Sequence, residues 1–244
     1  MAEGPWPVPG AGPLHGPLAH GLALGAHLAV HNGLVWNELG ATYQGYSTDR
    51  ARLRNPWGVL DRAAYRKTLE ALLTTRLVGR TYESVLQVRS TLAVRLGRTP
   101  TVPEWSAALT RRRPAPAEAA EAQEALRLAV TYEGRLRADG ALGADERVDT
   151  LAAFDYGRAV NVVRLALGAR LCDPYEAEQA VLRIGALAGQ AYSSWSRFSL
   201  GYSLARAMHF DEDDQSGVTY EQSLAQHRIL TQDPDSPYRN IAWS

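Results

Sequence analysis

The fold is decided by the stretch Phe154-Asp155-Tyr156-Gly157-Arg158-Ala159-Val160-Asn161, which lies within a long apolar segment. Polar side chains recur there at every third position, and Arg164 continues the series. At about 100° per residue, each step of three turns back by about 60° on a helix. The segment therefore predicts a central, mostly apolar α-helix with a slanting polar ridge, which we define as Asp155, Arg158, Asn161 and Arg164.

The polar ridge has two interpretations. Asp155 and Arg158 stand three residues apart, so they can form an ion pair on the helix. If the ridge is buried, it is a structural network between helices, and such pairs are common in all-α cores. If it faces a cleft, it is a binding site, and stability measurements on Arg158→Ala would separate the two.

A second segment, 195–210, adds further candidate residues. Its aromatic residues Trp195, Phe198 and Tyr202 share a helix face, which is more typical of a core than of a ligand site. An arginine beside aromatic residues, as at Arg206, is also what an anion-binding or protein-binding pocket uses. The candidate binding residues are Asp155, Arg158, Asn161, Ser194, Trp195 and Arg206.

Helical patterns also dominate the rest of the chain, and strand patterns are scarce. Caps are predicted at Asp61, at Thr81, at Thr101 with Glu104, and at Asp173 before Pro174. Glycines and prolines in 40–56 predict a loop there. The predicted helices are 18–33, 61–79, 81–97, 101–109, 118–138, 151–171, 175–192, 195–210 and 219–230. The expected fold is all-α, an irregular multi-helix bundle.

The sequence predicts three parts. Prolines and glycines make up about half of residues 1–17, which predicts a flexible N-terminal arm. Gly140 starts the clearest internal boundary, which separates an N-terminal helical part, 18–140, from a C-terminal helical part, 141–244. We expect these two parts to form one compact domain.

Composition excludes several classes of protein. The chain has 244 residues, 26 basic and 26 acidic side chains and 45% hydrophobic residues, which is typical of a soluble globular protein. No run of about 18 apolar residues predicts a membrane span. The first fifteen residues hold no Lys or Arg, so we expect no signal peptide. With the single cysteine, Cys172, no intrachain disulfide forms, and a cytoplasmic location is expected.

Charge is unevenly distributed along the chain. Residues 76–113 hold eight arginines but only two acidic residues, Glu83 and Glu104. Acidic residues prevail after 210, above all in 211–214. Either region can be a solvated surface or can recruit a charged partner. Nucleic acid is not the favoured partner, because no nucleic-acid-binding motif accompanies the arginines.

The sequence predicts no catalytic residue, metal or cofactor. His27 and His31 have the spacing of a zinc pair, and His20 precedes them, but no further ligand set follows at zinc-site spacing. The contiguous acids 211–214 lack the alternation of a calcium loop. Cys172 precedes an aspartate and has no evident base, and no nucleotide-binding or hydrolase motif is present.

In order and spacing, several short motifs resemble the bacterial family known as domain of unknown function 1266. They are Trp57-Gly58, Asp155-x-Gly157-Arg158-Ala159-Val160-Asn161, Ser194-Trp195, Arg206 and Asp233-Pro234-Asp235-Ser236-Pro237. The resemblance covers roughly 55–244, and it departs from the family pattern at Phe154, Ala205 and Tyr238. It implies a soluble, helical bacterial protein with no assigned activity.

Two functional hypotheses follow. The first is a non-enzymatic protein-binding module, of the immunity or antitoxin kind, whose acidic C-terminal surface or Arg158 and Arg206 meet a protein partner. The alternative is an enzyme or small-molecule binder with an anion-binding site at Asp155, Arg158, Asn161 and Arg206. A concave pocket joining these side chains favours the alternative, because a protein-binding surface can be flat.

Overall fold

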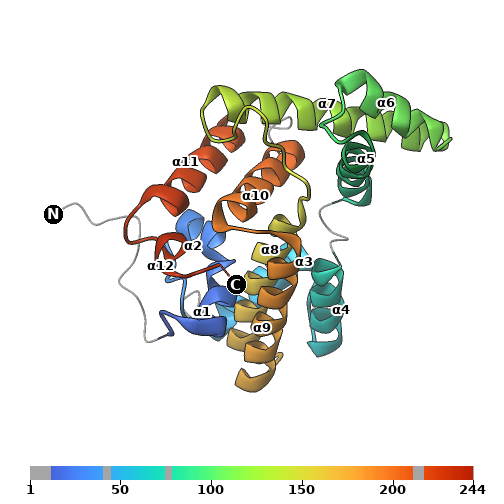
Figure 1. Cartoon of the computed structure of the whole chain (residues 1–244). Helices are drawn as coiled ribbons and strands as arrows, with labels where there is room; N and C mark the ends of the chain where they lie inside the picture. Colours follow the sequence, from blue (N-terminus) through green and yellow to red (C-terminus); the bar gives the residue numbers. More distant parts are fainter. Residues whose placement is uncertain (1–11, 41–44, 75–78, 211–216, 244) are drawn as a thin grey trace. The chain divides into compact units, whose positions relative to one another are not determined.

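The computed structural model of the chain describes residues 12–40, 45–74, 79–210 and 217–243 (Figure 1). Every regular element in these ranges is a helix, which confirms the predicted all-α fold. The helices are α1 Gly16–Ala23, α2 Ala26–Asn32, α3 Tyr46–Trp57, α4 Arg62–Leu73, α5 Arg80–Leu96, α6 Val102–Arg111, α7 Pro116–Ala138, α8 Ala152–Gly168, α9 Pro174–Ala191, α10 Trp195–Phe210, α11 Val218–Gln232 and α12 Pro237–Asn240. Most of the predicted arm and the acidic residues 211–214 lie outside the described residues.

The chain divides into two compact units. Unit 1 comprises Met1–Leu77, Asp155–Ser199 and Gln226–Ser244, and unit 2 comprises Val78–Phe154 and Leu200–Ala225. The domain boundary expected near Gly140 stays a prediction. None of the helices in the described ranges combines the length and apolarity that crossing a bilayer requires.

Local capping signals set where several helices begin. The Asp61 and Asp173 side chains each accept a hydrogen bond from the backbone N–H three residues later, and Thr101 forms a reciprocal capping box with Glu104. These contacts satisfy backbone N–H groups that the first turn of a helix leaves unpaired. These three predicted caps are confirmed, whereas the cap predicted at Thr81 is wrong, because α5 begins at Arg80 with Gly79 at its N-cap.

Two predictions about 18–56 are wrong in part. The structure has two helices, α1 and α2, where one helix is expected over 18–33, and Leu24 and Gly25 separate them. A Cβ atom on Gly25 would lie 2.9 Å from Cγ1 of Val160, so the backbone approaches α8 closely at this break.

The loop expected over 40–56 contains helix α3. Asp49 and Leu53, one turn apart, are fully buried, so tertiary packing favours the helix. Pro56 lies in the last turn, where its missing N–H removes only one bond. Gly58 then ends α3 in the left-handed region, at φ 63°.

Unit 1 has a tightly packed core. Helix α1 lies against α9, and a Cβ on Gly21 would lie 2.6 Å from the carbonyl oxygen of Val181. Glycine is therefore required for this close approach. At the start of α10, the Trp195 ring stacks on Tyr238 at 4.3 Å between centroids, and its Nε1 donates a hydrogen bond of 2.7 Å to the carbonyl of Ile241.

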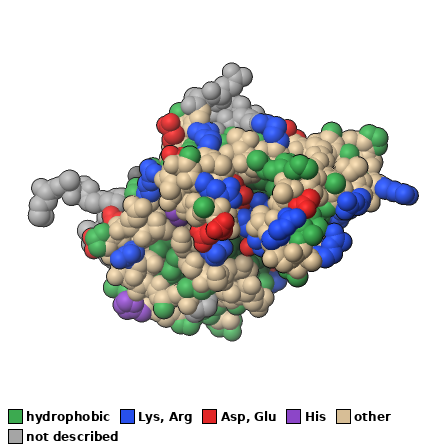
Figure 2. Space-filling view, turned by 45° about the horizontal axis from the view of Figure 1, so that its top comes forward, with side chains coloured by type: hydrophobic (Ala, Val, Ile, Leu, Met, Phe, Trp, Pro, Cys, Tyr) green, Lys and Arg blue, Asp and Glu red, His purple; other side chains and the backbone are tan. Residues whose placement is uncertain are grey.

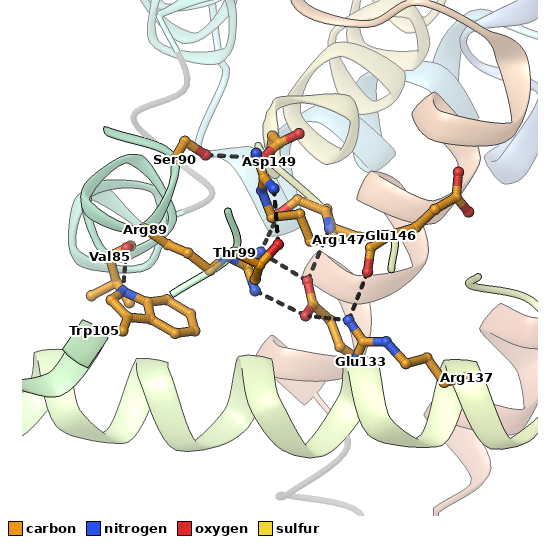
Figure 3. Close-up of polar contacts among 11 residues, drawn as sticks. Val85, Arg89, Ser90, Thr99, Trp105, Glu133, Arg137, Glu146, Arg147 and Asp149 are labelled. Atoms are coloured by element: carbon orange, nitrogen blue, oxygen red, sulfur yellow. Dashed lines mark hydrogen bonds and ion pairs between the residues drawn. The ribbon is translucent and has the colours of Figure 1, made fainter. Parts of the chain in front are cut away.

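Unit 2 is organised around a buried ion pair between α5 and α7 (Figure 3). The guanidinium of Arg89 donates two hydrogen bonds of 2.8 Å to the two carboxylate oxygens of Glu133. Val148 donates its N–H to Glu133 at 2.9 Å and accepts from Arg89 through its carbonyl at 2.5 Å. The Trp105 ring covers Arg89 at 4.6 Å, and its own N–H donates to the carbonyl of Val85.

Candidate ligand-binding groove

The polar ridge lies on α8, as predicted, within the part of this helix that belongs to unit 1. Its members have different surroundings. Asp155 and Arg164 are buried, and Arg164 donates a hydrogen bond of 2.6 Å to the carbonyl of Val35. Arg158 and Asn161 are only partly buried. The ridge therefore combines two buried structural groups with two groups that reach the surface.

Asp155 and Arg158 form the ion pair that their spacing predicts. The Asp155 side chain is fully buried, whereas that of Arg158 is 17% exposed. The Arg158 guanidinium also lies 5.7 Å from the ring centroid of Trp57, at the end of α3. Because two neighbours hold it, Arg158 is fixed in place while one side of it remains open.

The open side of Arg158 faces a groove of about 540 Å³ in unit 1. Segments α2, α3 and α8 contribute its lining. The lining residues are Leu28, His31, Asn32, Thr48, Ala51, Arg52, Asn55, Pro56, Trp57, Arg158, Asn161 and Leu165. We call this the ridge groove.

The lining of the ridge groove suits an anion. It includes two arginines, Arg52 and Arg158, and no carboxylate. The side-chain amides of Asn55 and Asn161 add further hydrogen-bond donors. His31 contributes a ring whose Nδ1 lies 3.2 Å from the amide nitrogen of Gln226. If Gln226 donates to Nδ1, neutral His31 carries its proton on Nε2.

The remaining candidate residues do not line the ridge groove. Ser194 accepts a hydrogen bond of 3.2 Å from the N–H of Arg197, so it caps the start of α10. Trp195 is buried in the core of unit 1. Arg206 belongs to unit 2, where it donates a hydrogen bond of 3.3 Å to Gln222. Of the six candidate binding residues, only Arg158 and Asn161 line the ridge groove, and the buried Asp155 forms an ion pair with Arg158.

Three histidines of unit 1, His20, His27 and His227, are buried and do not line the ridge groove. The His20 ring packs 4.9 Å from that of Trp195, and burial lowers the pKa of His20. Ser199 Oγ lies 2.9 Å both from His27 Nε2 and from His227 Nδ1, inside the core. Burial, with the nearby charge of Arg228, lowers the pKa of His227 to about 4. The rings of His20 and His227 therefore stay neutral near pH 7.

Cys172 is buried beside Tyr65. Burial raises the pKa of its thiol to about 11. A thiol of such high pKa is a weak nucleophile at neutral pH, as the sequence predicts for this cysteine.

Sequence reasoning missed several groove residues, chiefly Arg52, His31 and Asn32. Residues 40–56 were interpreted as a loop, so nothing indicated that Arg52 and Thr48 lie on one face of a helix. Trp57 was noticed only as part of a family motif. The sequence gives no clear signal for this helix, because the burial of Asp49 and Leu53 depends on tertiary packing.

Fold and site together define an all-helical protein with a basic groove beside its central helix. The chain belongs to the family described as "Protein of unknown function (DUF1266)", which matches residues 52–243 and confirms the resemblance seen in the sequence. The match includes Arg52, Trp57, Arg158 and Asn161 but begins after His31. No curated protein and no solved structure matches the chain significantly.

Proposed function

We propose that the protein binds a small anionic ligand in the ridge groove. The observation that carries the proposal is the meeting of Arg52, Arg158 and Asn161 around a concave space with no carboxylate in its lining. Arginine donates paired hydrogen bonds in a planar fork, which matches the geometry of carboxylate and phosphate groups. The ligand is therefore a carboxylate or a phosphate ester.

Asp155 acts on the ligand only through Arg158. The fully buried carboxylate of Asp155 accepts a hydrogen bond from the Arg158 guanidinium. This contact fixes the orientation of the guanidinium before the ligand binds. Such preorganisation lowers the entropy lost on binding. The indole of Trp57 offers an apolar face to the non-ionic part of the ligand.

Binding is preferred to catalysis because the lining consists mainly of hydrogen-bond donors and apolar side chains. The protein-binding module of the immunity or antitoxin kind stays a prediction, as do the cytoplasmic location and bacterial origin.

The test is calorimetric titration with inorganic phosphate, citrate and adenosine monophosphate. We expect saturable binding of at least one anion at one site per chain. Arg52→Ala and Asn161→Ala should each weaken it, Arg52→Ala by about 10- to 100-fold, since a hydrogen bond to a charged group contributes about 1.5–3 kcal/mol.

The matched control is Arg54→Ala, which removes an exposed arginine from the same helix but outside the groove lining. It should leave the affinity unchanged. Absence of saturable binding for all three anions at millimolar concentration, or equal losses in Arg52→Ala and Arg54→Ala, would contradict the proposal.

A further inference from the structure

Unit 2 carries a second basic depression on the outer face of α5. Arg80, Ser84, Thr91 and Arg95 recur at helical spacing and face the same side as the end of α6. At about 1.5 Å per residue, the fifteen steps from Arg80 to Arg95 extend over about 22 Å. This length fits an extended segment of several residues rather than a small molecule.

The depression has two neighbouring parts, of about 380 and 350 Å³. Ser84 and Arg112 line both parts, and Arg112 donates a hydrogen bond of 2.9 Å to Ser84 Oγ where the parts meet. Arg95 and Arg111 line the first part, and Arg80 lines the second. We call the two parts together the arginine groove.

Carboxylates nearby are engaged elsewhere. Glu83 accepts the N–H of Leu151 at 2.8 Å, and Glu104 accepts from Arg98 at 2.7 Å. Arg98, with the Thr101 N–H, lowers the pKa of Glu104 to about 2, so this carboxylate stays ionised and paired. Glu118, which lines the second part, accepts the N–H of Ala115 at the start of α7.

The positive charge of the arginine groove is therefore only partly offset, because its lining holds four arginines, Arg80, Arg95, Arg111 and Arg112, against one carboxylate, that of Glu118. Within the described ranges of the chain, no carboxylate forms an ion pair with Arg80, Arg95 or Arg111. In Figure 2, basic side chains (blue) gather at the right-hand edge, the side on which Figure 1 draws α6 and α7. Such a surface attracts a negatively charged partner.

We propose that the arginine groove docks an acidic, partly apolar segment of a partner protein. The apolar side chains Val88, Leu92 and Ala108 lie between the arginines in the first part. The residues that line the two parts include no aromatic ring on which a nucleobase can stack. An extended chain with alternating acidic and apolar side chains can pair with the arginines and also contact the apolar side chains between them. Single-stranded nucleic acid can pair only with the arginines.

This inference concerns a different unit and a different site from the proposed anion binding, and it gives the predicted protein-binding role a surface and a partner chemistry. Failure of one proposal leaves the other standing, because none of the residues that line the ridge groove lines the arginine groove.

The test is fluorescence anisotropy with three labelled probes on the full chain. The first is a synthetic peptide in which glutamate alternates with leucine and serine, the second replaces its leucines by serine, and the third is a uridine oligonucleotide of equal charge. We expect the leucine-containing peptide to bind most tightly. Arg95→Ala and Arg111→Ala should each weaken it about tenfold.

The control is Arg98→Ala, which removes the same charge from an exposed position outside the groove lining. It should change the affinity less than about twofold. Both groove arginines are exposed, so their variants should keep the melting temperature of the parent. The proposal is overturned by absence of peptide binding, by equal or tighter oligonucleotide binding, by equal binding of the serine peptide, or by an equal loss in Arg98→Ala.

Discussion

Each unit contains one arginine–carboxylate pair with a carboxylate that is almost or fully buried and a largely buried arginine, and these two pairs differ in what surrounds them. In unit 2, the side chains of Arg89 and Glu133 are both 4% exposed, and backbone groups of Val148 add a hydrogen bond to each. In unit 1, Asp155 is fully buried while Arg158 is 17% exposed and borders a groove. The first pair is closed, and the second is open on its arginine side.

This difference teaches how the same chemistry serves two purposes. A closed pair, with both side chains buried, is not accessible to a ligand, and its effect is to fix α5 against α7. In an open pair, the buried carboxylate holds the arginine in one orientation, and the exposed side of the guanidinium stays accessible to a ligand. We therefore assign the pair in unit 2 to the fold and propose the pair in unit 1 for recognition.

The largest expected effect comes from breaking the closed pair. Glu133→Ala leaves the Arg89 guanidinium buried without its carboxylate, so we expect a loss of about 3–5 kcal/mol in the free energy of unfolding. Glu124→Ala removes an exposed carboxylate from the same helix, where it pairs with Arg127, and should cost less than about 1 kcal/mol. Urea denaturation of both variants measures these losses, and equal losses would show that the pair in unit 2 is not closed.

A smaller change in folding stability is expected when the pH falls. In unit 1 the pKa of His227 is about 4 in the folded state, below its ordinary value of 6.5. Above pH 6.5 both states are neutral. As pH falls from 6.5 to 4, only the unfolded state binds the proton, so folding loses stability, by about 3 kcal/mol in total.

Urea denaturation across this pH range measures the loss. Because His227 shares Ser199 with His27, the variant His227→Asn keeps a polar atom near the position of Nδ1 and removes the titrating group. It should have a shallower pH dependence than the parent chain. An identical pH dependence in both proteins would show that burial of His227 does not govern the acid response.

Much of the fold was predictable because its signals are local. Asp61, Thr101 and Asp173 lie within three residues of the N–H groups that they cap or help to cap. The pair of Asp155 and Arg158 was predictable for the same reason, since its members stand one helical turn apart.

Contacts between residues far apart along the chain could not be predicted from the sequence. Arg89 and Glu133 are 44 residues apart, so no spacing rule joins them, and Arg89 was counted only among the charged residues of 76–113. Helix α3 was missed because Pro56 and the glycines before it resemble a loop, whereas burial of Asp49 and Leu53 depends on tertiary packing. No spacing rule joins Arg206 to Arg158 either, and since they belong to different units, their grouping stays a prediction.

The central claim is that Arg158, and not Arg89, meets the ligand. Nuclear magnetic resonance of the arginine guanidinium nitrogens, recorded while the tightest-binding anion of the calorimetric series is added, tests it directly. The account predicts that the Arg158 signals shift in a saturable way and that the Arg89 signals stay in place. Unchanged Arg158 signals at full occupancy would contradict it.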